Sequence, residues 1–449
     1  MLVSRVRGAV SLALAALASG AAATATATAG TTRTKANREV LKHGSPESVG
    51  MLPGPLEDMV ANLTGFTERR NWGGRSYNQT VPIEPGGTTI VARHGTIVSH
   101  FAFGKRNVWA GVDGAEGTPL PAREQEAATT DTIYDMASLT KVFTAAAALR
   151  CVDGGRLSLN ESVARYLPEF AAGGKGGVTV LQLLTHTSGL AADPVPGLFD
   201  PRYPTYESRV RAIAAQGLQH SPGTRYLYSD VNFMVLGLAL QRVTGRRLDE
   251  LVGDVTTRLG MDRTFFNRGN VEGPRLEHYA DMAAQEFQLA VQGDVAGEPR
   301  RPQPVRGSVH DENAWALGGV AGHAGLFSTA MDTARFCQML LNNGTYGGRR
   351  ILSRASVDLF FTDFLGGLGG HHHAVGFELN QFYTAGPMAN MLAASHTGFT
   401  GTSMVVDRAS GTLFVHLSNR VHPSRRWSSN NGVREALGAW VARALGRDV

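Results

Sequence analysis

A serine and a lysine lie one helical turn apart at the start of an apolar stretch of this chain. Residues 133–149 run IYDMASLTKVFTAAAAL, which predicts a short apolar lead-in and then a buried helix that begins near Ser138. A step of three residues on a helix moves about 60° round and ~4.5 Å along the axis. Ser138 Oγ and Lys141 Nζ can therefore meet without help from distant segments. A desolvated lysine can supply the base that a nucleophilic serine needs.

The residue type at position 141 supports this interpretation independently of its spacing from Ser138. Lysine occurs in this chain only at positions 35, 42, 105, 141 and 175, while arginine serves elsewhere. Arginine keeps its proton in proteins, whereas a buried ammonium can lose one. A lysine among apolar residues therefore indicates that a deprotonable amine is needed there. A serine three residues before a lysine is nevertheless common by chance, so two later segments have to support this interpretation.

The second segment, residues 226–230, has the sequence YLYSD and precedes an apolar helical run from Val231. This position predicts that Tyr228 and Asp230 lie in a loop at a helix start, with side chains pointing the same way. The ordinary pKa of a tyrosine phenol is ~10 and that of a lysine amine is ~10.4, so the two groups can exchange a proton readily. A single tyrosine before a helix is more often a packing residue.

The third segment, residues 395–402, has the sequence SHTGFTGT and precedes an expected strand at 403–406. Its glycines allow close approach of a substrate backbone, and a strand edge offers free N–H and C=O groups to an extended ligand. The Phe399 N–H could oppose the Ser138 N–H as an oxyanion hole. Taken by itself, this segment would be a glycine-rich turn.

Composition restricts the class of protein. The 449 residues allow up to ~3 domains. The net charge of +5 comes from scattered arginines without a basic stripe, so we expect no nucleic-acid partner. Residues 1–30 combine Arg5 and Arg7 with an Ala/Leu-rich run and small residues typical of a signal peptide. We therefore predict a secreted or periplasmic protein with no membrane contact after removal of the signal.

The remaining pattern predicts strands near both ends of the chain and helices between them. We expect strands at 88–98 with a turn at His94 and Gly95, and at 101–108, 403–406 and 412–417. We expect helices at 56–66, 138–153, 163–167, 178–184, 206–216, 231–244, 328–341 and 433–445, and loops over 111–130 and 266–314. This order predicts one α/β domain from residues 45–130 and 300–449, with a helical domain over 131–299 inserted.

The segments around Ser138, Tyr228 and His396, in this order and at these separations, resemble the serine β-lactamase and penicillin-binding-protein-like superfamily. The resemblance covers about residues 45–445 and is nearest to the branch of class C β-lactamases, DD-peptidases and carboxylesterases. It implies a β-lactamase/transpeptidase-like α/β fold: an antiparallel sheet flanked by helices plus an inserted all-α domain, with the site between them. It implies no cofactor and no metal.

The resemblance also implies roles for individual residues. Ser138 would be the acylated nucleophile, with Lys141 as its base or proton relay. Tyr228 would pass the proton to the leaving group, and the N–H groups of Ser138 and Phe399 would form the oxyanion hole. Substrate binding would involve Asp230, His396, Thr397 and Gly398.

Two positions depart from the family pattern. Asp230 replaces the usual asparagine, and a carboxylate only accepts hydrogen bonds. It would favour a charged Lys141 and move the role of base towards Tyr228. His396 replaces the usual lysine of the Lys-Thr-Gly motif and would be cationic only at mildly acid pH. We therefore do not expect efficient β-lactam hydrolysis.

Several other polar residues have less specific interpretations. We expect His371 to His373 to form a solvated loop rather than a metal site, and Cys151 and Cys337 to be buried free thiols, although export would permit a bridge. His186 and Ser188 are interpreted as turn and cap residues. Arg420 could pair with a substrate carboxylate. For His310, Asp311, Glu312 and His323, substrate contact and ordered-loop hydrogen bonding remain equal alternatives.

Three functions remain open at this point. The first is an exported serine hydrolase that forms an acyl-enzyme from an ester, an amide or a peptidoglycan-type peptide. The second is an acyl transferase on the same scaffold, with an alcohol or amine in place of water. The third is a non-catalytic binder of cell-wall peptide or penicillin, which Asp230 leaves possible. The sequence does not indicate an oligomeric state.

Overall fold

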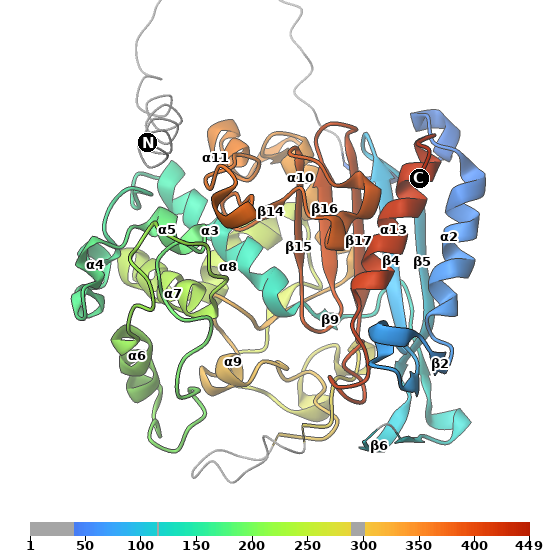
Figure 1. Cartoon of the computed structure of the whole chain (residues 1–449), viewed down its shortest axis with the longest axis horizontal. Coiled ribbons are helices and arrows are strands. Elements are labelled where there is room, and N and C mark those ends of the chain that lie inside the picture. Colours follow the sequence, from blue (N-terminus) through green and yellow to red (C-terminus); the bar gives the residue numbers. More distant parts are fainter. Residues whose placement is uncertain (1–39, 115, 289–300) are drawn as a thin grey trace, which may run out of the picture.

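The computed structural model describes residues 40–114, 116–288 and 301–449 (Figure 1). The predicted signal peptide at residues 1–30 lies outside these ranges. Within them, every helix is too short or too polar to cross a membrane.

An eight-stranded sheet joins the two ends of the described chain. Its order is β1 (Lys42–His43), β5 (Thr96–Asn107), β4 (Gly86–Arg93), β17 (Thr412–Ser418), β16 (Ser403–Asp407), β15 (Ala393–Thr397) and β14 (Glu378–Leu379), with β8 (Glu126–Ala127) beside β5. All neighbours are antiparallel except β1 and β5. The central pair is β4 and β17, where Ile90 lies opposite Val415. The sheet therefore forms only when segments from both ends of the chain have met.

The two faces of the sheet contribute to two separate cores because successive strand residues point to opposite sides. Ile90, Met404 and Val415 pack on the side of α10 (Ala330–Leu341). Val91 and Phe414 pack on the other side, under α2 (Pro53–Gly65) and α13 (Asn431–Ala444). In Figure 1, α2 and α13 lie side by side along this outer face.

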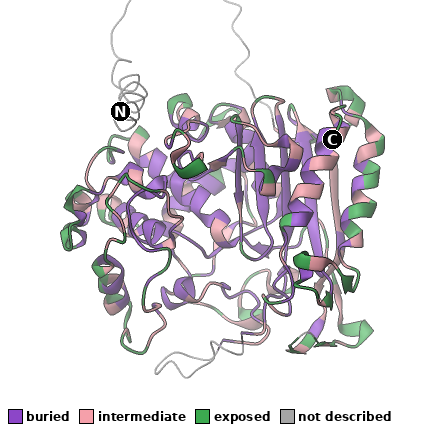
Figure 2. Cartoon of the chain, viewed as in Figure 1, coloured by how far each residue is buried: buried purple, intermediate pink, exposed green. Residues whose placement is uncertain are grey.

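A helical region lies beyond the α10 face of the sheet. It contains α3 (Thr140–Asp153), α4 (Val163–Tyr166), α5 (Val180–Leu184), α6 (Tyr206–Ala215), α7 (Asp230–Thr244) and α8 (Leu248–Thr256). The buried helix α3 contacts both α7 and α8. Figure 2 shows that α3 and the sheet are mostly buried, while exposed residues concentrate on peripheral helices and loops. Three short strands, β9 (Tyr134–Asp135), β10 (Phe265–Phe266) and β11 (Leu326–Ser328), form a small sheet beside α3.

The remaining elements are short. They are α9 (Glu312–Ala316), α11 (Arg354–Leu359), α12 (Phe382–Ala385), and the paired strands β2 (Arg70–Asn71) with β3 (Thr80–Val81), β6 (Trp109–Asp113) with β7 (Glu116–Pro119), and β12 (Thr345–Tyr346) with β13 (Arg349–Arg350).

The predicted α/β class is confirmed, and two local predictions are wrong. No separate third strand exists at 101–108, because β5 continues unbroken to Asn107 with Gly104 in a left-handed conformation at φ 66°. The region 111–130 is not only a loop, because β6 and β7 pair there. Cys151 and Cys337 are both buried and unbridged, as predicted. The proposed domain limits at 131 and 299 stay a prediction.

Gly438 offers a test of how closely α13 is seated. A Cβ atom at this position would lie 2.0 Å from the Ala385 carbonyl oxygen, whereas one at Gly253 in α8 would meet nothing within 4 Å. We expect Gly438→Ala to lower the free energy of unfolding by about 1–3 kcal/mol through overpacking. The matched change Gly253→Ala should raise it by about 0.4–1 kcal/mol. Urea unfolding of both variants measures this, and equal effects would contradict the tight contact.

Candidate active site

The backbone before Ser138 makes a sharp turn that presents the serine. Ala137 has φ 46°, a left-handed conformation that is costly for a residue with a side chain. The Asp135 carboxylate supports the turn by accepting the Ala137 N–H at 2.8 Å and the His310 N–H at 2.6 Å. Ser138 itself remains partly exposed, in the 3-10 turn η4 (Ala137–Leu139) that leads into α3.

The segment after β15 is fixed onto this turn. Thr400 Oγ1 donates to the Asp135 carbonyl at 2.7 Å, and Thr402 Oγ1 donates to the Met136 carbonyl at 3.1 Å. A Cβ atom at Gly398 would lie 2.0 Å from Thr402 Oγ1 and 2.5 Å from the Met136 oxygen, so only glycine fits there. These contacts bring residues near position 398 next to Ser138 despite the long separation in sequence.

Arg434 of α13 holds the same segment from behind. Its Nη2 donates to the carbonyls of Gly398 at 2.8 Å and Thr402 at 3.1 Å. Between these two residues, the Phe399 N–H donates to no carbonyl of the described residues. It is therefore free for an incoming oxygen, as the oxyanion-hole prediction requires.

Lys141 is completely buried and contacts three oxygens. Its Nζ donates to Ser138 Oγ at 2.8 Å and to the His323 carbonyl at 3.2 Å. It also lies 2.7 Å from Asp230 Oδ1, a distance that makes an ion pair although this oxygen is not aligned for a hydrogen bond. The structure thus brings together three predicted residues and adds the backbone carbonyl of His323, a contact that the residue type does not predict.

Asp230 is the first residue of α7, and Ser229 caps this helix by accepting the Asn232 N–H at 3.2 Å. The backbone N–H of Ser229 donates in turn to His186 Nδ1 at 3.0 Å, and that of Asp230 donates to the Ala192 carbonyl at 2.7 Å. His186 is therefore a positioning residue for this loop, in agreement with its interpretation as a turn residue near the site.

Tyr228 completes the group around Ser138. Tyr228 lies close enough to Ser138 for the serine hydroxyl to affect its phenol, and Lys141 Nζ lies 4.9 Å from the centre of its ring. Burial, followed by the nearby Asp230 charge, raises the pKa of Tyr228 well above its ordinary value. The phenol therefore stays protonated at neutral pH, and the expectation that Tyr228 takes over as the base is not supported.

His396 differs from the expectation of a charge at mildly acid pH. Burial, followed by the nearby Lys141 cation, lowers the pKa of His396 to about 3. Its Nδ1 lies 2.8 Å from the Thr397 carbonyl, so a neutral ring donates through Nδ1 and leaves Nε2 without a proton. The family's fixed cation is thus replaced by an uncharged ring.

These residues border a cleft of about 510 Å³. Its lining includes Ser138, Tyr228, His396, Thr397, Gly398 and Phe399, and beyond them Tyr77, Tyr226, His371, Glu378, Tyr383, Arg420, Asn430 and Arg434. The strand β14 pairs with β15 only as far as Ser395, which leaves the edge of β15 free from His396 onwards. An extended ligand therefore has both a cleft and an unpaired strand edge beside the serine.

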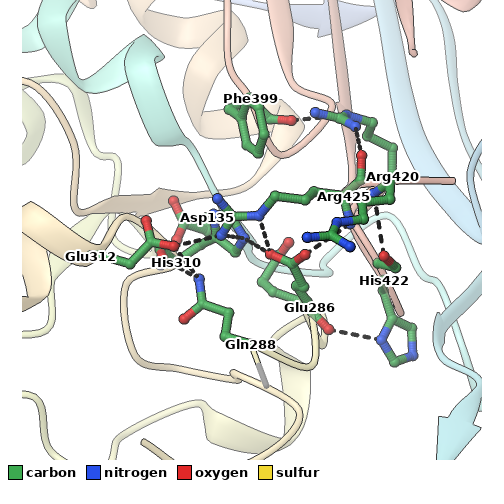
Figure 3. A network of polar contacts seen from close by, with 12 residues as sticks. Asp135, Glu286, Gln288, His310, Glu312, Phe399, Arg420, His422 and Arg425 are labelled. Atoms are coloured by element: carbon green, nitrogen blue, oxygen red, sulfur yellow. Dashed lines mark hydrogen bonds and ion pairs between the residues drawn. The ribbon is translucent and has the colours of Figure 1, made fainter. Parts of the chain in front are cut away.

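A polar network supports the cleft from below Phe399 (Figure 3). Arg425 donates to Glu286 at 2.5 Å and to Glu312 at 2.6 Å, and His310 Nε2 lies 2.9 Å from Glu286. Phe399 lies above this network with about half of its surface exposed. For His310 and Glu312, these contacts favour ordered-loop hydrogen bonding over substrate contact.

Arg420 also has a structural role in this region. Its Nε donates to the Phe399 carbonyl at 2.9 Å and its Nη1 to the Ser428 carbonyl at 2.7 Å (Figure 3). Its guanidinium lies 4.6 Å from the centre of the Phe399 ring. Because Arg420 still borders the cleft, its proposed contact with a substrate carboxylate stays a prediction.

The three-histidine segment departs from the prediction of a solvated loop at one residue. His371 is exposed, but His373 is buried with its ring 5.1 Å from that of His186. Burial lowers the pKa of His373 to about 4. His373 therefore adds a neutral ring behind the wall of the cleft.

Asp230, Asp311 and His323 are the one group of described residues with metal-ligand spacing, within 4.8 Å of one another. The Lys141 ammonium already lies against Asp230, and His323 Nε2 lies 2.9 Å from Asp311. A metal ion there would be repelled by the ammonium, so the group fits an internal ion-pair cluster better than a metal centre.

The buried histidines predict a pH-dependent stability. His373 and His396 stay neutral in the folded chain at pH 5, whereas in the unfolded chain they gain protons below their ordinary pKa of about 6.5. The unfolded state then binds more protons, so stability falls by about 1.4 kcal/mol per pH unit per histidine as pH drops below about 6. Urea unfolding at pH 7.5 and 5.0 should show a smaller loss for His396→Gln than for the unchanged chain. An equal loss would contradict a neutral His396.

Comparison with known proteins agrees with this geometry. The chain is 32% identical over 396 residues to the "Putative D-alanyl-D-alanine carboxypeptidase" of Escherichia coli (strain K12), with 82% of this chain and 86% of the relative covered. Among solved structures, EstCE1, "a hydrolase with promiscuous acyltransferase activity", aligns with TM-score 0.61 and 21% identity over 86% of this chain and 99% of EstCE1.

The octameric penicillin-binding protein homologue from Pyrococcus abyssi aligns with TM-score 0.60 and 20% identity, over 88% of this chain and 78% of that protein. These two structures agree with the fold described above. The sequence model of the Beta-lactamase family matches residues 81–439. The chain therefore belongs to the Beta-lactamase family and is a serine hydrolase of the β-lactamase and penicillin-binding-protein-like superfamily.

Proposed function

We propose that this chain hydrolyses a small ester, an amide or a peptidoglycan-type peptide through an acyl-enzyme on Ser138. The observation that supports this most directly is the hydrogen bond of 2.8 Å between Lys141 Nζ and Ser138 Oγ, with the Tyr228 phenol near the same serine. Export is part of the proposal, supported by the composition of residues 1–30.

The geometry accounts for the steps of such a reaction. Ser138 Oγ attacks the substrate carbonyl carbon while its proton passes to Lys141, and the N–H groups of Ser138 and Phe399 bind the oxygen that gains negative charge. When the intermediate collapses, Tyr228, a neutral phenol, donates a proton to the departing alcohol or amine and regains one from Lys141. Water then enters the open cleft and attacks the acyl carbon, and the proton that it loses passes through the same groups to the departing Ser138 Oγ.

Features of the cleft favour some substrates over others. The free edge of β15 from His396 onwards suits an extended acyl chain. The neutral His396 supplies no charge for the carboxylate of a β-lactam, which argues against efficient β-lactamase activity. The name of the Escherichia coli relative supports a D-alanyl-D-alanine peptide as the natural substrate class.

Acyl transfer is the second candidate. The structural likeness to EstCE1, whose title states a promiscuous acyltransferase activity, supports it together with the open cleft. An alcohol or amine that reaches the acyl-enzyme before water would then be the acceptor. The choice between the two depends on the rates of these competing steps.

The nucleophile is tested by active-site labelling. A fluorophosphonate probe should label the unchanged chain and fail to label Ser138→Ala, because Ser138 alone among the described serines accepts a hydrogen bond from a lysine. Ser48→Ala, at an exposed serine that is not part of the cleft lining, should be labelled normally. Mass spectrometry of the labelled peptide checks the position, and equal labelling of Ser138→Ala would refute the assignment.

The substrate class is tested by a panel of p-nitrophenyl esters, a D-Ala-D-Ala peptide and nitrocefin. We expect turnover of the esters or the peptide to exceed that of nitrocefin, because His396 is uncharged. Adding an alcohol shows by product ratio whether transfer competes with hydrolysis. Tight binding of the peptide or of penicillin without any turnover would instead favour a non-catalytic binder.

A further inference from the structure

The Lys141 ammonium is surrounded by oxygens before the reaction begins. An ammonium has three N–H groups and no acceptor. Lys141 Nζ donates to Ser138 Oγ at 2.8 Å and to the His323 carbonyl at 3.2 Å, and it lies 2.7 Å from Asp230 Oδ1 in an ion pair. The Asp230 carboxylate is therefore the direct counter-charge of this ammonium. As an ammonium, Lys141 donates to Ser138 and has no lone pair with which to accept the serine proton.

Tyr228 does not supply the missing base. Its phenol lies near Ser138, but burial and the Asp230 charge hold it in the neutral form. The histidines nearby do not reach the serine either, since no hydrogen bond joins His186 or His396 to Ser138 among the described residues. The group in contact with this network that can take a proton is the Asp230 carboxylate.

Other carboxylates lie near Asp230 in this cluster. Asp193 and Asp311 come from two other segments, and burial followed by the charges of Asp230 and Asp311 raises the pKa of Asp193. Asp311 is paired with His323 at 2.9 Å. Burial keeps the nearby rings of His186 and His396 uncharged. Asp230 thus shares the cluster with two further carboxylates and is the one in contact with the Lys141 ammonium.

We propose that Asp230 is the final proton acceptor for acylation, reached from Ser138 through Lys141. This assignment rests on the proposed function, with Ser138 as nucleophile. In the step, the Ser138 O–H bond breaks as Oγ bonds to the carbonyl carbon, and the π electron pair moves to the oxyanion. Lys141 Nζ takes the serine proton and gives one of its three protons to Asp230, 2.7 Å away.

The charges balance at the end of this step. Lys141 is again an ammonium, Asp230 is a neutral acid, and the negative charge that Asp230 carried is now on the oxyanion. When the intermediate collapses, Asp230 returns its proton through Lys141 and Tyr228 to the leaving group. Asp230 thus allows Lys141 to relay the serine proton while Lys141 remains an ammonium.

A p-nitrophenyl ester isolates this step, because p-nitrophenolate leaves without needing a proton. Asp230→Asn should lower kcat/KM by about 10²–10⁴-fold, the usual contribution of general base catalysis, mainly through kcat. The acid limb of its pH profile should move to higher pH, because Lys141 must then lose a proton before it can accept one. Asp193→Asn removes a charge from the same cluster without contact to Lys141 and is the matched control for general electrostatics.

Chemical rescue separates this role from a structural one. The Asp230 side chain is 17% exposed, so a small carboxylate can enter the space left by Asp230→Ala. Formate should restore activity to Asp230→Ala and not to Ser138→Ala. The proposal would be overturned if Asp230→Asn were at least as active as the unchanged chain and the acid limb of its pH profile did not move. It would also be overturned if both Asp230 variants lost activity and formate did not restore it in Asp230→Ala. Labelling of Ser138→Ala tests the nucleophile separately.

Discussion

The structure around this site depends on one buried ammonium. Burying the charge of Lys141 without partners would cost several kcal/mol. The chain offsets this cost with oxygens from three separate segments: the turn before α3, the start of α7 and the loop that leads into β11. The ion therefore links three parts of the fold at one atom. The same contacts that make its burial tolerable also set the position of the serine.

A second property of the site is its supply of uncharged histidine rings. His186, His373 and His396 all have lowered pKa values, in each case chiefly because of burial. The ring centres of His186 and Tyr228 lie 4.5 Å apart, so the phenol packs against an uncharged imidazole ring. These rings therefore add no charge to that of Lys141 and Asp230. Uncharged surroundings suit a reaction that moves protons over short distances and creates one transient oxyanion.

Local spacing explains which parts of this arrangement were predictable. The meeting of Ser138 with Lys141 follows from helix geometry alone, and α7 and α10 follow from apolar periodicity and their caps. The role of the Asp135 carboxylate was not predictable, because the His310 N–H that it accepts lies 175 positions away in the sequence. Similarly, the lowered pKa of His396 follows from tertiary burial, which a histidine-for-lysine exchange does not reveal by itself. The long course of β5 was missed because its polar residues resemble a break, whereas they lie on a partly exposed strand.

The hydrogen bonds from Arg434 to the carbonyls of Gly398 and Thr402 have a consequence for biosynthesis. The serine and the lysine leave the ribosome before the segment that faces them and before the helix that secures this segment. A nascent chain can therefore form the α3 helix and its Ser–Lys pair while the opposite wall of the cleft is still missing. The complete site then requires the synthesis of α13.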